Sequence, residues 1–147
     1  MLLPTLSPLY ARELGRLYDE IAAYQDESQL WTVAPGISNS AGNLCLHLIG
    51  NLNHFIGAGL GQNGYVRDRA LEFAAKDVPR AELLARIVAT KAVVLDTLEG
   101  LTDADLEAAG DFFKSGEPVS AAHLLVHLLG HINYHLGQIN YHRRLLH

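Results

Sequence analysis

With 147 residues, the chain is about the size of one ordinary domain, and we expect residues 1–147 to form a single one. Hydrophobic residues make up 49% of it and charged residues 18%, a composition that builds a sizeable core and excludes a disordered chain. The net charge of −5, counted with neutral histidines, argues against a nucleic-acid partner, which would require a basic patch.

The sequence predicts neither a signal peptide nor a membrane span. Residues 1–15 have no basic segment and no long apolar segment. Residues 28–66 carry no formal charge, but His47 and His54 interrupt them, so we expect a buried helix and loops there. The single cysteine, Cys45, excludes an internal disulfide and fits a reducing cytoplasm. It lies opposite His47 on the predicted helix, which indicates a core residue.

Ser7 and Pro8 predict the start of the first helix, because Ser is a good N-cap and Pro is favoured at the first helical position. We expect this helix to end near Asp26. Its apolar residues follow the three- and four-residue spacing of an amphipathic helix: Tyr10, Leu14, Leu17, Tyr18 and Ile21. Residues 29–40 are predicted to form a loop.

A second helix is predicted from Ser40 to about Leu60, and its sequence is apolar over most of the circumference, as in a buried helix. His47, Asn51 and His54 form a polar stripe on one face, at positions i, i+4 and i+7. Buried polar groups need partners, and a metal ion or a wet cavity would provide them.

Residues 61–79 form the longest connection, which fits a crossover between two parallel helices. For Arg67 and Arg69 in this connection we expect a solvated loop or ion pairs. A third helix follows from near Pro79 to about Glu99. Its apolar residues are Leu83, Leu84, Ile87, Val88, Val94, Leu95 and Leu98.

Helix caps delimit the rest of the chain. Asp77 is a plausible cap for the third helix, and Thr102 with Asp105 resembles a capping box for a short helix. Pro118 and Ser120 begin the last helix. Four long helices without a convincing strand run predict an all-α protein, a four-helix bundle.

The last helix carries a row of histidines at steps of four. At 100° per residue, His135 lies about 50° from the centre of the apolar face, His131 about 90°, His127 about 130°, and His123 almost opposite. His131 and His135 lie at the core boundary, where a metal-ligating side chain has to lie if it is to face another helix. His127 is the next best placed. His142 lies near the same line, close to the C-terminus, where helices fray.

Two imidazoles four residues apart on a helix can hold one metal ion. A single buried histidine is more often a hydrogen-bonded core residue, but the pair, together with the polar stripe of the second helix, favours a metal site. Either His47 or His54 can supply the third ligand. Three neutral histidines leave a fourth tetrahedral position open, as in catalytic sites. No acidic residue lies clearly on the metal-facing stripes, so no general base is assigned.

Three segments resemble the DinB-like superfamily of small bacterial four-helix proteins: GNLCLHLIGNLNHFI, YVRDRALEF and LLVHLLGHINYHLGQINYHRRLL. The most specific is HINYHLGQI, which is similar to the family's final-helix H-x-x-x-H followed by x-G-Q. The resemblance implies an up-down-down-up bundle, frequent homodimers and a divalent metal, typically zinc or nickel. It also implies a metal triad of one histidine on the second helix and two on the last, here His47, His131 and His135.

The resemblance also suggests an activity, because similar proteins include thiol-dependent transferases and isomerases. We therefore expect a metal-dependent S-transferase that uses a low-molecular-weight thiol, or a related hydrolase. Asn51, His54, Tyr134 and Gln138 are candidates for contacts behind the metal ligands or with substrate. The alternative is a non-catalytic metal- or ligand-binding bundle with a stress-related role. A di-iron carboxylate site is disfavoured, because no Glu-x-x-His occurs in the sequence.

Overall fold

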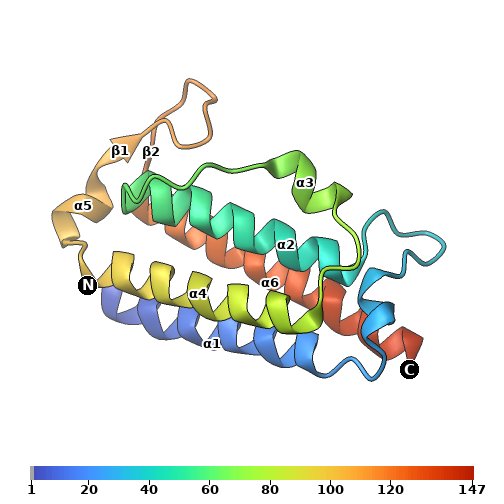
Figure 1. Cartoon of the computed structure of the whole chain (residues 1–147). Helices are drawn as coiled ribbons and strands as arrows, with labels where there is room; N and C mark the ends of the chain where they lie inside the picture. The colour runs from blue at the N-terminus through green and yellow to red at the C-terminus, as the bar shows by residue number, and fades with distance from the viewer. Residues whose placement is uncertain (1) are drawn as a thin grey trace.

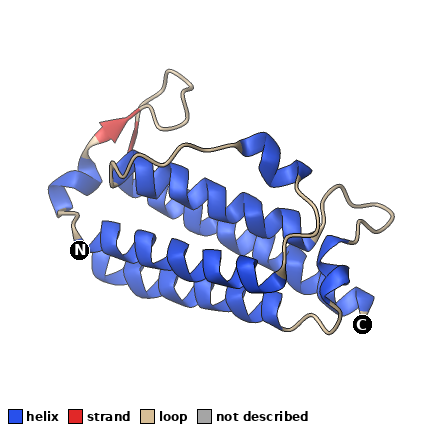
Figure 2. Ribbon diagram, viewed as in Figure 1, coloured by secondary structure: helices blue, strands red, loops and turns tan. Residues whose placement is uncertain are grey.

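A computed structural model of the protein describes residues 2–147 and is mostly helical, as predicted (Figure 1, Figure 2). The long helices of the described part are α1 (Leu3–Ala22), α2 (Ala41–Leu52), α4 (Arg80–Glu99) and α6 (Ala121–Leu146). A π-helical segment, Asn53–Leu60, continues α2. Shorter elements lie in the connections: a 3₁₀ helix (Glu27–Trp31), α3 (Arg69–Ala74) and α5 (Asp103–Glu107).

The connection from α2 to α4 determines where the candidate site lies. Figure 1 shows α2 and α4 starting at the same end of the molecule, so the chain after residue 60 has to return along the bundle. On its way it forms α3, which packs on α2. A second helical layer therefore covers the part of α2 that carries the polar stripe.

The first helix begins earlier than predicted, so Ser7 is not its N-cap. It starts at Leu3 and contains Pro8. Pro4 occupies the first turn, where a missing N–H costs no intrahelical hydrogen bond. Leu6, in the added turn, is buried, and its packing favours extension of the helix in this direction.

Several other helix ends agree with the sequence. The side chains of Ser40 and Ser120 accept hydrogen bonds at the starts of α2 and α6, and Thr102 forms the predicted capping box of α5. Asp77 does not cap α4, because Pro79 takes the N-cap position and the backbone at Asp77 has a φ of +57°.

A short strand pair, β1 (Ala109–Gly110) with β2 (Val119–Ser120), was not predicted from the sequence. The two strands are antiparallel, with Ala109 opposite Ser120. They close the loop before α6, and the Ala121 N–H continues the pairing by donating to the Ala108 carbonyl. Such short strands depend on a partner across the loop and leave no periodic pattern in the sequence.

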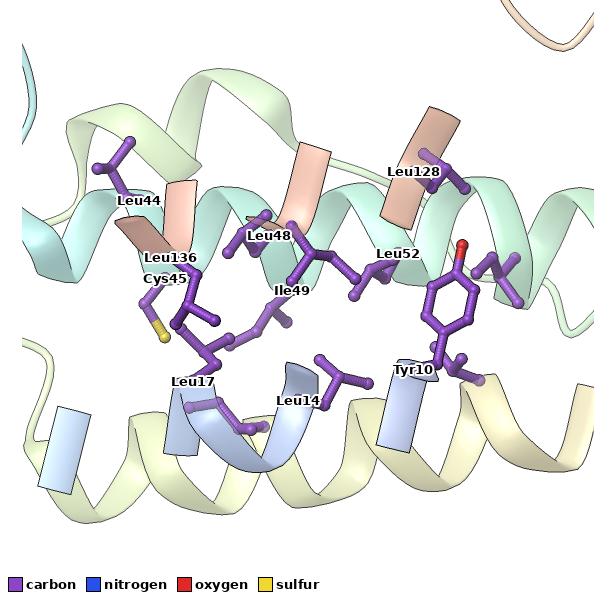
Figure 3. Packing of buried hydrophobic residues seen from close by; sticks show 14 of the residues in the cluster. Tyr10, Leu14, Leu17, Leu44, Cys45, Leu48, Ile49, Leu52, Leu128 and Leu136 are labelled. Carbon is purple, nitrogen blue, oxygen red and sulfur yellow. The ribbon is translucent and has the colours of Figure 1, made fainter. Parts of the chain in front are cut away.

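The core lies between α1, α2, α4 and α6, and Figure 3 shows part of it, with Leu14, Leu48 and Leu136 contributed by three different helices. Cys45 is fully buried among these side chains, and burial raises the pKa of its thiol to about 12. The prediction that it is a core residue is confirmed. Tyr18 and Val88, by contrast, are 37% and 57% exposed and do not belong to the core, because each lies one residue beyond the buried stripe of its helix.

No helix within residues 2–147 combines the length and the apolar character that crossing a membrane requires.

Candidate metal centre

Three histidines from two helices bring their Nε2 atoms together. The Nε2 of His131, on α6, lies 3.2 Å from the Nε2 of His47 on α2 and 3.0 Å from the Nε2 of His135. The possible ligand atoms of all three lie within 4.8 Å of one another. In a tetrahedral zinc site with Zn–N bonds of about 2.0–2.1 Å, neighbouring nitrogens lie about 3.3 Å apart. The spacing of this cluster therefore suits a divalent cation.

Hydrogen bonds set the tautomers of two of the rings. The Nδ1 of His47 lies 3.0 Å from Glu72 Oε1, and the Nδ1 of His135 lies 2.7 Å from Gln138 Oε1. Both oxygens only accept, so each Nδ1 carries the proton and donates it. A neutral imidazole has one N–H, and the Nε2 atoms of His47 and His135 are therefore left with lone pairs that are directed to the cluster.

His131 lies between these two lone pairs. Its Nδ1 is buried and has no hydrogen-bond partner within the described residues. A proton on the Nε2 of His131 can serve only one of the two neighbours, whereas a cation would accept lone pairs from all three rings. The donor set therefore fits a metal ion better than it fits a hydrogen-bonded histidine cluster.

Burial favours the neutral form of two of the rings, His131 and His47. Desolvation, helped by the neighbouring His135 and His47, lowers the pKa of His131 to about 4. Burial also lowers the pKa of His47 and outweighs the opposing effect of the hydrogen bond that His47 donates to Glu72. Only a neutral imidazole can bind a metal, so near neutral pH the two rings are in the ligating form.

A carboxylate and a guanidinium support His47 from behind. Arg67 binds Glu72 with two hydrogen bonds of 2.9 Å, from Nε to Oε2 and from Nη2 to Oε1. Nη2 also lies 3.4 Å from His47 Nδ1, but both nitrogens are donors, so this is a contact and not a bond. Arg67 thus forms one of the ion pairs expected for this connection. The bidentate pair fixes the carboxylate that orients His47.

Hydrogen bonds at both ends of α3 place Glu72 at this point. Asp68 caps α3 by accepting from the Leu71 N–H at 3.1 Å. The side-chain amide of Asn43, on α2, donates to the carbonyl oxygens of Glu72 at 3.0 Å and of Ala75 at 2.8 Å. These bonds hold the C-terminal end of α3 against α2.

Gly50 leaves the space that the carboxylate occupies. A Cβ at this position of α2 would lie 1.9 Å from Glu72 Oε2. Glycine is unfavourable inside a helix, and here the close approach of a buried carboxylate accounts for it.

Two of the predicted supporting residues lie beside His135. Gln138 binds its Nδ1, and the ring of Tyr134 packs edge-on with centroids 5.3 Å apart. Gln138 therefore acts on His135 much as Glu72 acts on His47.

The other two candidates follow His47 along the helical chain. Asn51 is buried, and its Oδ1 has no partner among residues 2–147. His54 packs edge-on against Phe55, with burial lowering its pKa, and is not part of the three-histidine cluster. Of the two alternatives on the polar stripe, the structure therefore brings His47 and not His54 to the last-helix pair.

The remaining histidines of α6 lie outside the cluster. His127 is exposed and packs against the Phe113 ring at 5.0 Å, and His123 is exposed as predicted.

The prediction that the last helix frays near His142 is wrong. Helix α6 runs on to Leu146, and the His142 side chain is buried. Its Nε2 lies 2.8 Å from the Thr32 carbonyl oxygen, to which it donates, so its Nδ1 accepts from the Tyr24 hydroxyl at 2.6 Å. These two contacts with distant segments hold the last turns of the helix.

Glu72 is the residue that the sequence did not reveal. It lies on neither histidine helix, so helical phase could not relate it to the cluster. The available signal was weaker: Arg67 and Glu72 lie on either side of a good helix cap, Asp68, in the longest connection.

Fold and site together define a class: a helical bundle with three histidines converging between two of its long helices. The sequence matches the profile of the DinB superfamily over residues 10–139, and the chain belongs to that superfamily. Among solved structures it is similar to a DinB-like protein from Bacillus cereus ATCC 10987, with 22% sequence identity and a TM-score of 0.72. That alignment covers 91% of this chain and 85% of the other, and it concerns the fold alone. No curated protein matches the sequence.

Proposed function

We propose that this protein is a divalent-metal-binding member of the DinB superfamily, with an up-down-down-up bundle and zinc or nickel held by His47, His131 and His135. The observation that carries the proposal is the convergence of three Nε2 atoms, two of them fixed as lone-pair donors by Glu72 and Gln138. A set of three imidazole nitrogens prefers a transition-metal ion to magnesium or calcium, which favour oxygen ligands.

We further propose that the site is catalytic and transfers a low-molecular-weight thiol, or hydrolyses a related substrate. Three protein ligands leave a coordination position for substrate, which separates catalytic from structural zinc sites. A divalent cation held by the three histidines would supply Lewis acidity, which would lower the pKa of a bound thiol or water into the physiological range.

In the transfer reaction, the thiol sulfur forms a bond to an electrophilic carbon of the second substrate. The bond from that carbon to its leaving group breaks, both electrons go to the leaving group, and the thiol proton is released to solvent. The residues around the histidines orient the metal ligands. Glu72 holds His47 and Gln138 holds His135, each by a hydrogen bond from Nδ1 of the histidine.

Elemental analysis of tag-free protein tests the metal site. The wild type should contain about one equivalent of zinc or nickel per chain, and His131→Ala and His135→Ala should lose it. His123→Ala is the matched control, because His123 is an exposed histidine of the same helix. Wild-type protein without metal, or variants that keep it fully, would refute the triad.

Assays with metal-loaded protein then separate an enzyme from a binding protein. Cysteine or glutathione is offered together with an aryl halide, and we expect thioether formation that depends on His131. If loaded protein shows no turnover with any pair of thiol and electrophile, and hydrolyses no ester, the non-catalytic alternative replaces the catalytic proposal.

A further inference from the structure

A pocket adjoins the histidine cluster on the side of His135. It has a volume of about 570 Å³ and lies between the loop of residues 34–39 and the C-terminal half of α6. His135 and Gln138 are part of its wall, and so is Leu44 of α2, which precedes His47 by one helical turn. The volume falls within the roughly 300–1,000 Å³ that is usual for small-molecule sites.

The wall of this pocket is uncharged. None of its residues is Asp, Glu, Lys or Arg. Aliphatic side chains such as Ile37 and Leu145 and the rings of Tyr134 and Tyr141 line it. A charged group placed here would lose hydration without gaining an ionic partner, whereas an apolar group gains from leaving water.

The surroundings of His47 have a different chemistry. There His47 contacts Glu72, which is paired with Arg67. A substrate that reaches the cluster thus meets the ion pair of Glu72 and Arg67 behind His47 and an uncharged pocket beside His135, and the pocket offers room for the apolar part of the substrate.

Gln138 provides a polar contact in the pocket wall beside His135. Its carbonyl oxygen accepts from His135 Nδ1, and its amide nitrogen makes no hydrogen bond within the described part of the chain. That N–H₂ group can donate to an oxygen of a ligand, such as a hydroxyl or a carbonyl group. A ligand bound in this way would lie against the ring of His135.

From these observations we propose that the pocket binds the uncharged, apolar body of the substrate, an aromatic ring system with a hydroxyl or carbonyl oxygen next to Gln138. The inference rests on the proposed function in so far as it takes the histidine cluster as the reacting centre. The pocket itself is formed by residues 34–39, Leu44 and α6, and its binding of an uncharged ring can be measured without any metal.

Calorimetric titration with 2-naphthol and with 2-naphthoate tests this class of ligand, because the two probes share a ring system and differ in charge at pH 7. We expect one molecule of 2-naphthol to bind per chain with a Kd below about 1 mM, and 2-naphthoate to bind at least tenfold more weakly. Equal affinities, or no binding of 2-naphthol, would overturn the proposal.

The double variant Ile37→Asp/Leu145→Asp places two charges on the pocket wall, at side chains that are 43% and 80% exposed and lie outside the hydrophobic core. It should weaken 2-naphthol binding at least tenfold. Val88→Asp/Val126→Asp is the matched control, since these valines are 57% and 54% exposed and do not line this pocket. If the control weakens binding as much as the pocket variant does, the probe binds elsewhere and the assignment is wrong.

His131→Ala separates this inference from the proposed function. His131 does not line the pocket, so the variant should lose metal and retain 2-naphthol binding. If the wild type binds no metal but binds 2-naphthol, the metal centre is refuted and the pocket assignment stands. Metal binding without 2-naphthol binding would refute the pocket alone.

Discussion

Gly50→Ala is the substitution that most directly tests how the second layer supports the metal centre. The added methyl group would lie 1.9 Å from Glu72 Oε2, and ordinary contact begins at 3.4 Å, so the carboxylate would have to move by 3.4 − 1.9 = 1.5 Å. The hydrogen bond from His47 Nδ1 to Glu72 is 3.0 Å long, and the two from Arg67 are 2.9 Å long. A shift of that size cannot preserve all three.

Two effects of opposite sign decide the stability of this variant. Replacing a mid-helix glycine with alanine stabilises a helix by about 1 kcal/mol. Losing one hydrogen bond to a charged, buried group costs about 1.5–3 kcal/mol. The free energy of unfolding should therefore fall by about 0.5–2 kcal/mol. Zinc affinity should fall by about 10–100-fold, because His47 loses the partner that orients it.

Competition with a chromophoric chelator measures the zinc affinity, and urea unfolding of the metal-free protein measures the stability. Gly15→Ala is the matched control, because a Cβ on this α1 glycine meets no atom within 4 Å. It should raise the free energy of unfolding by up to about 1 kcal/mol and leave zinc affinity unchanged. If Gly50→Ala binds zinc within threefold of the wild type, Glu72 does not hold His47 for a metal, and the account of the second layer fails.

Three further predictions concern buried polar groups. Glu72→Gln keeps the shape of the side chain but leaves Arg67 without its ionic partner. The free energy of unfolding, measured by urea titration, should therefore fall by about 2–3 kcal/mol. An unchanged value would show that the ion pair does not stabilise the fold. Tyr24→Phe removes the donor to His142 Nδ1 and should lower the free energy of unfolding by about 1–3 kcal/mol, whereas Tyr18→Phe, at an exposed position, should leave it unchanged. The metal-free protein should lose stability as the pH falls from 6.5 towards 4, because the unfolded chain protonates His131 near pH 6.5 and the folded chain only near 4. Allowing for partial exposure, the loss is about 1–2 kcal/mol, and urea titrations at pH 7 and 4.5 should find it reduced in His131→Ala.

Helix positions near the site could be predicted because their signals are local. Ser40 and Ser120 cap α2 and α6 through hydrogen bonds to N–H groups three residues away. The pair His131 and His135 follows from the geometry of a single helix, in which residues four apart share a face. Where a local signal failed, as at Ser7, burial of Leu6 by other helices favoured a longer helix.

The sequence by itself thus determined the helical class, the starts of α2, α4 and α6, and the two last-helix histidines, since each depends on atoms within about one helical turn. Helical phase left both His47 and His54 open, the family resemblance favoured His47, and the tertiary structure brings His47 to the last-helix pair. The two histidines lie seven residues apart on one stripe, which is about 10 Å along the helix axis. The position along that axis at which α2 packs against α6 brings His47 to His131. The tertiary structure also brought Glu72 to His47, because a carboxylate on a separate short helix can be related to the cluster only through packing between segments far apart in the chain.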